Sequence, residues 1–310
     1  MFLACAAGRV IAQAPAKLNL YLELLGRRTD GYHELETLMV PVTIFDTIVF
    51  ATTVRDQVQL TCSTSTGDEA HGAASGAHTL FTGDLPASDD NLVIRAIMRL
   101  RDAAGVTAGA TIHLIKRIPS AAGFGGASSD AAAALLAANA AWRLRWPRDE
   151  LACLAADLGS DIPFFLGHGP AICRGRGELV EPLALKTPLH VVVARPPDGL
   201  STASVYQHCC LPAEPACLKP LVAALHRGDS GEVARHLVNR LEPAAARLTP
   251  WITRLRRAFN RLDCVGHQMT GSGTGYFGIC RHARHARRVA ARLRSEELGY
   301  VRVAATLLTS

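Results

Sequence analysis

The sequence predicts an α+β fold with enough chain for two domains. Its 310 residues are enough for two domains of ordinary size or for one large α/β domain, and an apolar share of 49% indicates a globular protein rather than a disordered chain. Strand-like patterns fill much of the first hundred residues, and helices and strands are mixed in the rest. Because they do not alternate as regular βαβ units and no internal repeat is visible, a doubly wound sheet is not expected.

The residue patterns place each element in turn. Strands are predicted where apolar and polar residues alternate or β-branched residues gather, and helices where apolar residues recur at helical spacing. The expected strands are 14–25, 38–50, 58–62, 111–118, 189–194, 266–270, 276–279 and 300–304. The expected helices are 92–103, 129–141, 148–158, 201–209, 218–225, 231–237, 244–260 and 283–295. Residues 63–90, rich in small and polar types, are expected to form an exposed loop.

A boundary is expected near residue 185, because the buried strand 189–194 opens a second half of the chain. This gives an N-terminal domain over 1–185 and a C-terminal domain over 186–310.

The formal net charge of +6 is concentrated in the arginine-rich segment 281–294. Contact with nucleic acid is one interpretation of that segment. The apolar positions Val289, Ala290 and Leu293 fit one buried helix stripe, so a solvated arginine face is favoured and no nucleic-acid partner is expected.

The cysteines and the termini indicate a cytoplasmic protein. The nine cysteines are scattered without paired C-x-x-C spacing, which is typical of reduced cytosolic thiols, and the cluster Cys209, Cys210 and Cys217 has no histidine at zinc-finger spacing. The apolar N-terminus lacks the basic region and the length of a signal peptide. No other stretch has 18 apolar residues, so no membrane association is expected.

The most informative segment is the glycine loop, residues 122–133, between the strand 111–118 and an alanine-rich helix. Glycines allow close backbone approach, and free helix N–H groups attract phosphate. A Walker A loop is excluded because no lysine follows the glycines. A dinucleotide fingerprint is disfavoured because Ser128 replaces its third glycine. Ser128 or Ser129 is expected to cap the helix, leaving the other hydroxyl to face a phosphate or its metal ion.

Three other segments carry candidate functional residues. In the strand 14–25, Lys17, Asn19, Tyr21 and Glu23 share one face, for which solvation is the simplest interpretation. Asp161 follows a helix-ending glycine and precedes an apolar run; it is either an N-cap or turn residue, or a partly desolvated base beside a lysine. The glycine-rich stretch 269–278 is expected to approach a ligand or another loop closely.

These segments together resemble the GHMP superfamily of small-molecule kinases. The match runs in order from residue 15 to about residue 280, through 15–20, 30–35, 90–93, 118–133, 159–165, 175–178, 201–206, 239–242 and 269–278. The resemblance implies a two-domain fold with the active site in the cleft between the domains, and ATP-dependent phosphorylation of an alcohol. Segments 15–20 and 30–35 point to members whose substrate carries a cytidine diphosphate group. Ala127 stands where the family usually has glycine, and Phe124 where leucine is common.

The resemblance also implies roles for individual residues. Asp161 is the expected general base, and Lys17 is expected to keep that carboxylate ionised and to neutralise charge on the transferred phosphoryl group. The ATP phosphates are expected to lie against a set of loop residues, with Asn91 bordering the adenine: Pro119, Gly123, Gly125, Gly126, Ala127, Ser128 and Ser129. Mg²⁺ is expected, with either serine hydroxyl as a contact.

For the second substrate, the resemblance implies that Tyr32 and His33 hold a cytosine base and that Tyr206 stacks on it, unless Tyr206 is a core residue. Asn19 and Thr202 are expected to contact the alcohol portion, with Gly271 and Gly273 lining the same site.

A kinase for mevalonate, homoserine or a sugar is the alternative function. A second alternative is a protein of another class, either a nucleotide-binding oxidoreductase or a regulatory module. The expected assembly is a monomer or a homodimer.

Overall fold

The chain divides into two compact units. The computed structural model describes residues 1–65 and 90–308, so most of the predicted loop 63–90 lies outside the described residues. Unit 1 comprises Met1–Ala16, Ile44–Ser120 and Gly125–His168. Unit 2 comprises Lys17–Thr43, Ala121–Phe124 and Gly169–Ser310. Two long strands, β2 (Arg9–Arg27) and β3 (His33–Thr53), each contribute residues to both units.

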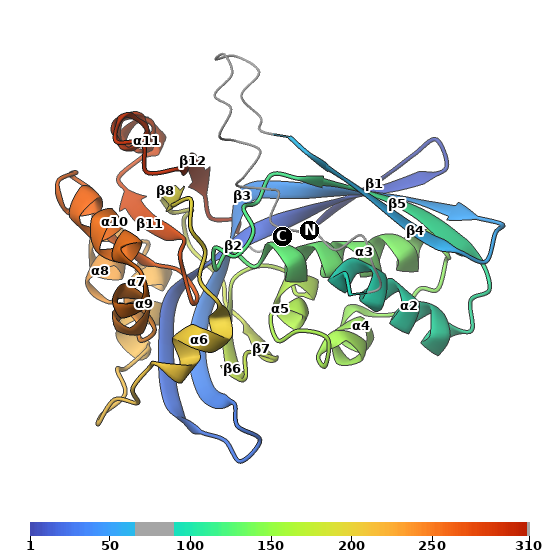
Figure 1. The fold of residues 1–310 in the computed structure, drawn as a ribbon, viewed down its shortest axis with the longest axis horizontal. Coiled ribbons are helices and arrows are strands. Elements are labelled where there is room, and N and C mark those ends of the chain that lie inside the picture. Colours follow the sequence, from blue (N-terminus) through green and yellow to red (C-terminus); the bar gives the residue numbers. More distant parts are fainter. Residues whose placement is uncertain (66–89, 309–310) are drawn as a thin grey trace. The chain divides into compact units, whose positions relative to one another are not determined.

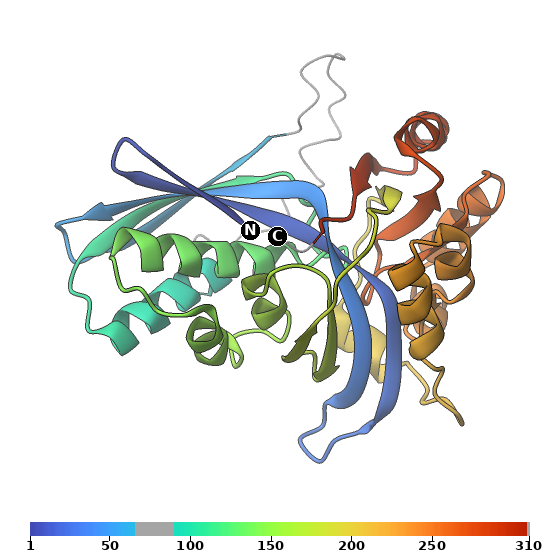
Figure 2. The ribbon, with the colours of Figure 1, turned by 180° about the vertical axis from the view of Figure 1, so that it is seen from behind.

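Unit 1 is a layer of strands covered by helices. The start of β2 pairs antiparallel with β1 (Phe2–Ala6), and the end of β3 pairs antiparallel with β5 (Gly109–Lys116), which pairs parallel with β4 (Val58–Thr64). Four helices lie on one side of β4 and β5 (Figures 1 and 2): α2 (Leu92–Ala104), α3 (Gly126–Ala141), α4 (Arg148–Ala155) and α5 (Ile162–Leu166). Helix α3 packs against α2 and α5, and ten of its residues are buried, so it is the central helix of this unit.

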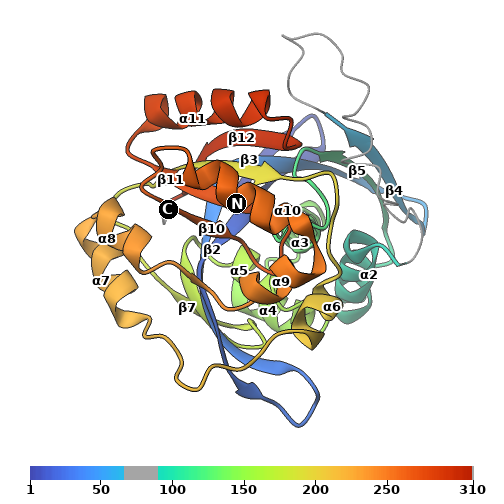
Figure 3. The same ribbon diagram turned by 60° about the vertical axis from the view of Figure 1, so that its left-hand side comes forward.

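Unit 2 is built on a four-stranded antiparallel sheet in the order β10-β11-β8-β12. These strands are β10 (Gly266–Met269), β11 (Tyr276–Cys280), β8 (His190–Arg195) and β12 (Tyr300–Ala305). Helix α10 (Pro250–Asn260) packs on β10 and β11, and α11 (Ala283–Ser295) lies along β12 and β8 (Figure 3). The buried core includes Val192 and Ala194 of β8 with Phe259 of α10 and Leu293 of α11.

Shorter elements complete unit 2. The hairpin of β6 (Ala171–Gly175) and β7 (Leu179–Pro182) pairs with the start of β3, and β9 (Val238–Asn239) pairs parallel with β2 at Tyr21 and Leu22. The remaining helices are α6 (Thr202–Gln207), α7 (Lys219–Arg227), α8 (Ser230–Arg235) and α9 (Glu242–Leu248).

Most predicted elements are confirmed, and α11 has the predicted bounds. The single helix expected over 244–260 is wrong, because the chain breaks at Thr249 into α9 and α10. Thr249 is extended, its hydroxyl accepts a hydrogen bond from the Trp251 N–H, and Pro250 opens the new helix. Strands β1, β6, β7 and β9 and the short helix α5 were not predicted; each has five residues or fewer.

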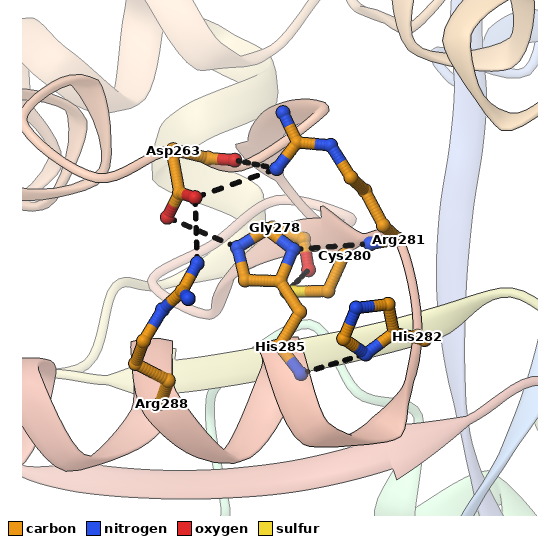
Figure 4. A network of polar contacts seen from close by, with 7 residues as sticks. All are labelled: Asp263, Gly278, Cys280, Arg281, His282, His285 and Arg288. Carbon is orange, nitrogen blue, oxygen red and sulfur yellow. Dashed lines mark hydrogen bonds and ion pairs between the residues drawn. The ribbon is translucent and has the colours of Figure 1, made fainter.

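The start of α11 is fixed by a polar network around Asp263 (Figure 4). The Asp263 carboxylate accepts hydrogen bonds from Arg288 (2.7 Å), from the Nε2 of His285 (3.0 Å) and from Arg281 (3.4 Å), and His282 caps the helix. Val289, Ala290 and Leu293 are buried, as the predicted stripe requires. Two arginines of the basic segment therefore bind a carboxylate at the helix start.

All nine cysteines are free thiols. Within residues 1–65 and 90–308, the helices lack the combined length and apolar character that a membrane crossing needs.

The polar face of β2 is buried, so the interpretation as a solvated face is wrong. Glu23 is 0% exposed; its carboxylate binds the guanidinium of Arg240 at 2.5 and 2.6 Å and accepts the N–H groups of Ala216 and Leu24 at 3.0 Å. The Tyr21 hydroxyl donates to the Ala216 carbonyl at 2.6 Å. These bonds attach the segment before α7 to the middle of β2.

Replacing Glu23 with glutamine should lower stability by about 3–5 kcal/mol at neutral pH, because Arg240 loses its buried partner. Burial raises the pKa of Glu23, but the bonds from Arg240, Ala216 and Leu24 outweigh it and hold this pKa below the usual 4.5. The stabilisation is therefore complete above pH 4.5 and is lost as the pH falls through the lower pKa of the folded state.

Urea unfolding of the wild type and E23Q between pH 3 and pH 8 checks this expectation. The gap in unfolding free energy should be constant above pH 5 and shrink in acid. Glu214, which is exposed, supplies the control variant E214Q. A gap that does not change with pH would contradict the assignment.

Candidate active site

The first half of the glycine loop, Ala122–Phe124, packs backbone to backbone against the glycine-rich stretch 269–278. The Gly275 N–H donates to the Ala122 carbonyl, and the Lys17 N–H donates to the Phe124 carbonyl, both at 2.9 Å. Gly123 has a φ of +72°, and a methyl group there would overlap the Thr270 carbonyl. The predicted close approach of the stretch 269–278 to another loop is confirmed.

The second half of the loop begins α3 in unit 1. The helix starts at Gly126 after Gly125, which has a φ of +71° and caps it without a side chain. The prediction that Ser128 or Ser129 is the N-cap is wrong, because the glycines turn the chain and the helix starts before either serine. Both serines lie in the first turn. The Ser129 hydroxyl is buried and has no hydrogen-bond partner among the described residues.

A buried ion cluster lies beside this helix start. The Lys116 ammonium at the end of β5 binds Asp130 of α3 at 2.7 Å and also binds Asp46 of β3. Asp46 in addition accepts the N–H groups of Arg117 and Ile118. A methyl group on Gly126 would lie 3.3 Å from the Lys116 Nζ, so the ammonium lies close to the glycine loop backbone.

The cluster keeps Lys116 positively charged. Burial lowers the pKa of Lys116, but Asp130 and Asp46 outweigh it and raise this pKa above its usual value. Burial raises the pKa of Asp130, and the Lys116 charge opposes that effect only in part. The N-terminus of α3 by itself favours bound phosphate, while the Lys116 charge is balanced by the two carboxylates. Lys116 was not predicted, although it follows Ile112 and Leu114 on the buried side of β5.

Lys17 is buried in unit 2 and is 4% exposed. Its ammonium donates to the Asn19 side-chain oxygen at 2.6 Å. Asn19 contacts the stretch 269–278, since its N–H donates to the Thr270 hydroxyl at 3.0 Å. A methyl group on Gly271 would lie 3.3 Å from the Lys17 Nζ. Three predicted site residues, Lys17, Asn19 and Gly271, are therefore brought together.

The stretch 269–278 is held in place from two sides. The side-chain amide of Asn239, the last residue of β9, donates to the carbonyls of Met269 (2.8 Å) and Gly271 (2.9 Å); Asn239 was not predicted as a site residue. The hydroxyls of Thr202 and Ser272 share a hydrogen bond of 2.9 Å. Thr202, an exposed predicted substrate contact, therefore lies next to the same stretch.

The three aromatic residues predicted to hold a base form two separate contacts. The rings of His33 and Tyr206 contact each other, with centroids 5.4 Å apart and planes at 34°. Tyr32 is 56% exposed, and the Arg176 guanidinium lies 5.2 Å from its ring centroid. Burial and, to a lesser degree, Arg27 lower the pKa of His33, so its ring is neutral at pH 7 and has one donor and one acceptor nitrogen.

Two further predicted residues lie in unit 1 at helix starts. Asp161 is half-buried at the N-cap of α5, but its side chain makes no capping hydrogen bond. It therefore occupies the N-cap position, one of the alternatives expected from the sequence, and its role as a base stays a prediction. Asn91 caps α2, because its side-chain oxygen accepts the Val93 N–H at 2.9 Å.

Comparison with known protein families supports the class that this geometry indicates. Residues 91–169 match the family model of the GHMP kinases N terminal domain, and residues 221–298 match that of the GHMP kinases C terminal. The fold is also that of a crystal structure of homoserine kinase from Cytophaga hutchinsonii, with a TM-score of 0.71 at 18% identity over 100% of this chain and 98% of that one. The chain is thus a GHMP-type small-molecule kinase, as the resemblance implied.

Closer relatives define the group within that class. A 4-diphosphocytidyl-2-C-methyl-D-erythritol kinase of Pelotomaculum thermopropionicum is 40% identical over 92% of this chain and 94% of its own length. The corresponding kinase of Shouchella clausii is 36% identical over 91% and 89%. A crystal structure of a 4-(cytidine 5'-diphospho)-2C-methyl-D-erythritol kinase has a TM-score of 0.77 and 35% identity, with coverage of 96% and 98%. This chain belongs to the 4-diphosphocytidyl-2-C-methyl-D-erythritol kinase family.

Replacing Gly275 with alanine tests the backbone contact between the two glycine segments. A methyl group there would meet the Ala122 carbonyl and the Phe124 ring, so one segment has to move. We expect a loss of at least about 2 kcal/mol in stability from this overpacking, together with a loss of activity. Gly26 has open space around it, so G26A is the matched control, and thermal unfolding of both variants measures the effect. Equal stability of G275A and the wild type would contradict the contact.

Replacing Lys116 with methionine should destabilise unit 1 by about 3–5 kcal/mol, because Asp46 and Asp130 would remain buried without a cation. The change D130N keeps the shape of the side chain and removes one carboxylate. It should therefore lower the free energy of unfolding by less than K116M does. Urea unfolding at pH 7 compares the two variants. A smaller loss for K116M than for D130N would show that the ammonium does not hold the cluster together.

Proposed function

We propose that this protein transfers the γ-phosphoryl group of ATP to the 2-hydroxyl of 4-diphosphocytidyl-2-C-methyl-D-erythritol, a step in the non-mevalonate route to isoprenoid precursors. Membership of the kinase family named above supports this substrate. The observation that carries the catalytic assignment is the buried Lys17 ammonium beside Gly271. A buried cation in contact with glycine backbone suits a site that receives phosphate.

In the proposed reaction, the substrate hydroxyl oxygen bonds to the γ-phosphorus as the bond to the β,γ-bridging oxygen breaks, and ADP leaves. Asp161 orients the hydroxyl and accepts its proton. Lys17 neutralises charge on the transferred group. Since phosphoryl transfer has a loose transition state, positioning and charge stabilisation provide most of the rate, and early removal of the proton contributes less.

The glycine loop is the proposed site of the ATP phosphates. Its contacts are assigned to the residues predicted for it: Pro119, Gly123, Gly125, Gly126, Ala127, Ser128 and Ser129. The backbone N–H groups at the start of α3 favour an anion there. Asn91 caps α2 through its side-chain oxygen and is assigned to the border of the adenine site.

Mg²⁺ fits the residues at this loop. It usually binds through one or two carboxylates together with substrate phosphates and waters, and in some nucleotide sites a Ser or Thr hydroxyl is a ligand, so a dedicated cluster is not required. Among residues 1–65 and 90–308, no three acidic, histidine or cysteine side chains are grouped as metal ligands, whereas the Ser129 hydroxyl is buried without a partner. We assign Ser128 or Ser129 as the contact. When bound, the ion would neutralise charge on the ATP phosphates.

The second substrate is assigned to the aromatic and polar residues of unit 2. Tyr32, His33 and Tyr206 are proposed to recognise the cytosine, since a neutral His33 offers both a donor and an acceptor. Asn19, Thr202, Gly271 and Gly273 are proposed to contact the alcohol and diphosphate. His33 and Tyr206 contact each other, so the base must bind on an outer face or separate the two rings. We further propose a cytoplasmic monomer or homodimer without a nucleic-acid partner.

ADP release tests the substrate assignment. The purified protein with ATP and Mg²⁺ should release ADP in the presence of 4-diphosphocytidyl-2-C-methyl-D-erythritol, and much less with mevalonate or homoserine. Release with mevalonate or homoserine alone would identify another kinase of the superfamily. If no acceptor raised ADP release above background in a folded sample, the proposal would be rejected.

The changes D161N and K17M should each lower kcat by at least about 100-fold, the range expected for a lost acid–base or charge-stabilising group. The exposed residues Asp149 and Lys219 provide the controls D149N and K219M. Thermal unfolding confirms that each variant is folded. Near-normal kcat in D161N or K17M would refute the role of that residue.

A further inference from the structure

A chain of buried hydrogen bonds in unit 2 ends at the Lys17 ammonium. Lys17 donates to the Asn19 side-chain oxygen (2.6 Å), the Asn19 side-chain N–H donates to the Thr37 hydroxyl (2.8 Å), and that hydroxyl donates to the backbone carbonyl of Tyr21 (2.6 Å). The Thr270 hydroxyl also donates to the Asn19 side-chain oxygen, at 3.2 Å. Lys17, Asn19, Thr37 and Thr270 are all less than 5% exposed.

The direction of each bond in this chain is determined. An ammonium only donates and a backbone carbonyl only accepts, so the two ends of the chain have fixed polarity. The single hydroxyl proton of Thr37 goes to the Tyr21 carbonyl, so Thr37 must accept from the Asn19 amide. The amide nitrogen of Asn19 therefore faces Thr37, and its oxygen faces Lys17.

Thr270 strengthens the same orientation. It accepts the backbone N–H of Asn19 at 3.0 Å, so its own proton is available for the Asn19 side-chain oxygen. The side chain of Gln268 donates to the backbone carbonyls of Asn19 and Leu20, which further fixes β2 at this point. A flipped Asn19 amide would direct an N–H group at the Lys17 ammonium and leave Thr37 without its donor.

We infer that Thr37 and Thr270 are positioning residues that hold the Lys17 ammonium in place through the side-chain amide of Asn19. The inference rests on the proposed function for its catalytic consequence, because Lys17 is the charged group that acts on the phosphoryl group there. Neither threonine is assigned a substrate contact. Their role is to keep the Asn19 oxygen directed at Lys17, so that the cation cannot move away from the backbone of Gly271.

The change T37V tests the inference, because valine keeps the shape of threonine and removes both of its bonds. We expect kcat to fall about 10-fold or more, with KM for ATP changed less than about 2-fold, since a misplaced charge affects the transition state most. T37S retains the hydroxyl and should restore kcat to within about 3-fold of wild type. T270V and T270S form a second pair with the same expectation.

A double-mutant cycle separates positioning from a general loss of stability. If Thr37 acts through Lys17, then T37V should lower kcat no further in a K17M background. Thr306, another buried threonine whose hydroxyl accepts the Leu189 N–H at 2.9 Å, supplies the control: T306V should lose stability while kcat stays within about 2-fold of wild type. An equal fall in kcat from T37V in the wild-type and K17M backgrounds would overturn the inference.

The position of the ammonium can also be observed without any turnover. The chain has only four lysines, of which Lys17 and Lys116 are buried and Lys186 and Lys219 are exposed. In protein labelled with ¹⁵N at the lysine Nζ, K17M identifies the Lys17 signal. T37V should shift or broaden that signal and leave the Lys116 signal unchanged, whereas T37S should leave both unchanged.

An unchanged Lys17 signal in T37V would overturn the inference whether or not the proposed reaction is correct. Failure of the proposed function would appear differently, as the absence of ADP release by the wild-type protein with the cytidyl substrate while the Lys17 signal still responds to T37V.

Discussion

The backbone contact between Ala122–Phe124 and Thr270–Gly275 is the constraint on which the site in unit 2 depends. It leaves no room for a side chain at Gly123 or Gly275, and it is closed by the hydrogen bond from Gly275 to Ala122. The bond between the Lys17 N–H and the Phe124 carbonyl joins β2 to the same contact. Three segments far apart in the sequence therefore meet through their backbones, and the Lys17 side chain is placed where they meet.

The two buried lysines join different parts of the fold. Lys116 binds two carboxylates, so its charge is balanced within the fold. Lys17 donates to the side-chain oxygen of Asn19 at 2.6 Å, within β2 of unit 2. Lys116 therefore joins β3, β5 and α3 within unit 1, whereas Lys17 joins the hydrogen-bond chain of Asn19, Thr37 and Thr270 in unit 2.

Much of the fold follows from local patterns, but the support of the site does not. The alternation in β2 and the glycine spacing of 122–133 predict a strand and a tight loop that the structure contains. The predicted N-cap of α3 is wrong because Gly125 is the N-cap and the helix begins at Gly126, before Ser128 and Ser129. Thr37 and Thr270 could not be predicted, since Asn19 and Thr270 are 251 residues apart and only the folded chain joins them. The ion cluster of Lys116 likewise could not be predicted, since its partner Asp46 lies 70 residues away in the sequence.

The alternation of β2 also limits how this part of the gene can change. Lys17, Asn19, Tyr21 and Glu23 occupy every second position, and each is bound to a different part of unit 2: Lys17 to Asn19 beside Gly271, Asn19 to Thr37 and Thr270, Tyr21 to Ala216, and Glu23 to Arg240. Inserting or deleting one residue within this segment would turn the side chains beyond that point to the opposite face of the strand. Substitutions at the intervening apolar positions keep the register, so the length of this segment is more strictly constrained than its apolar composition.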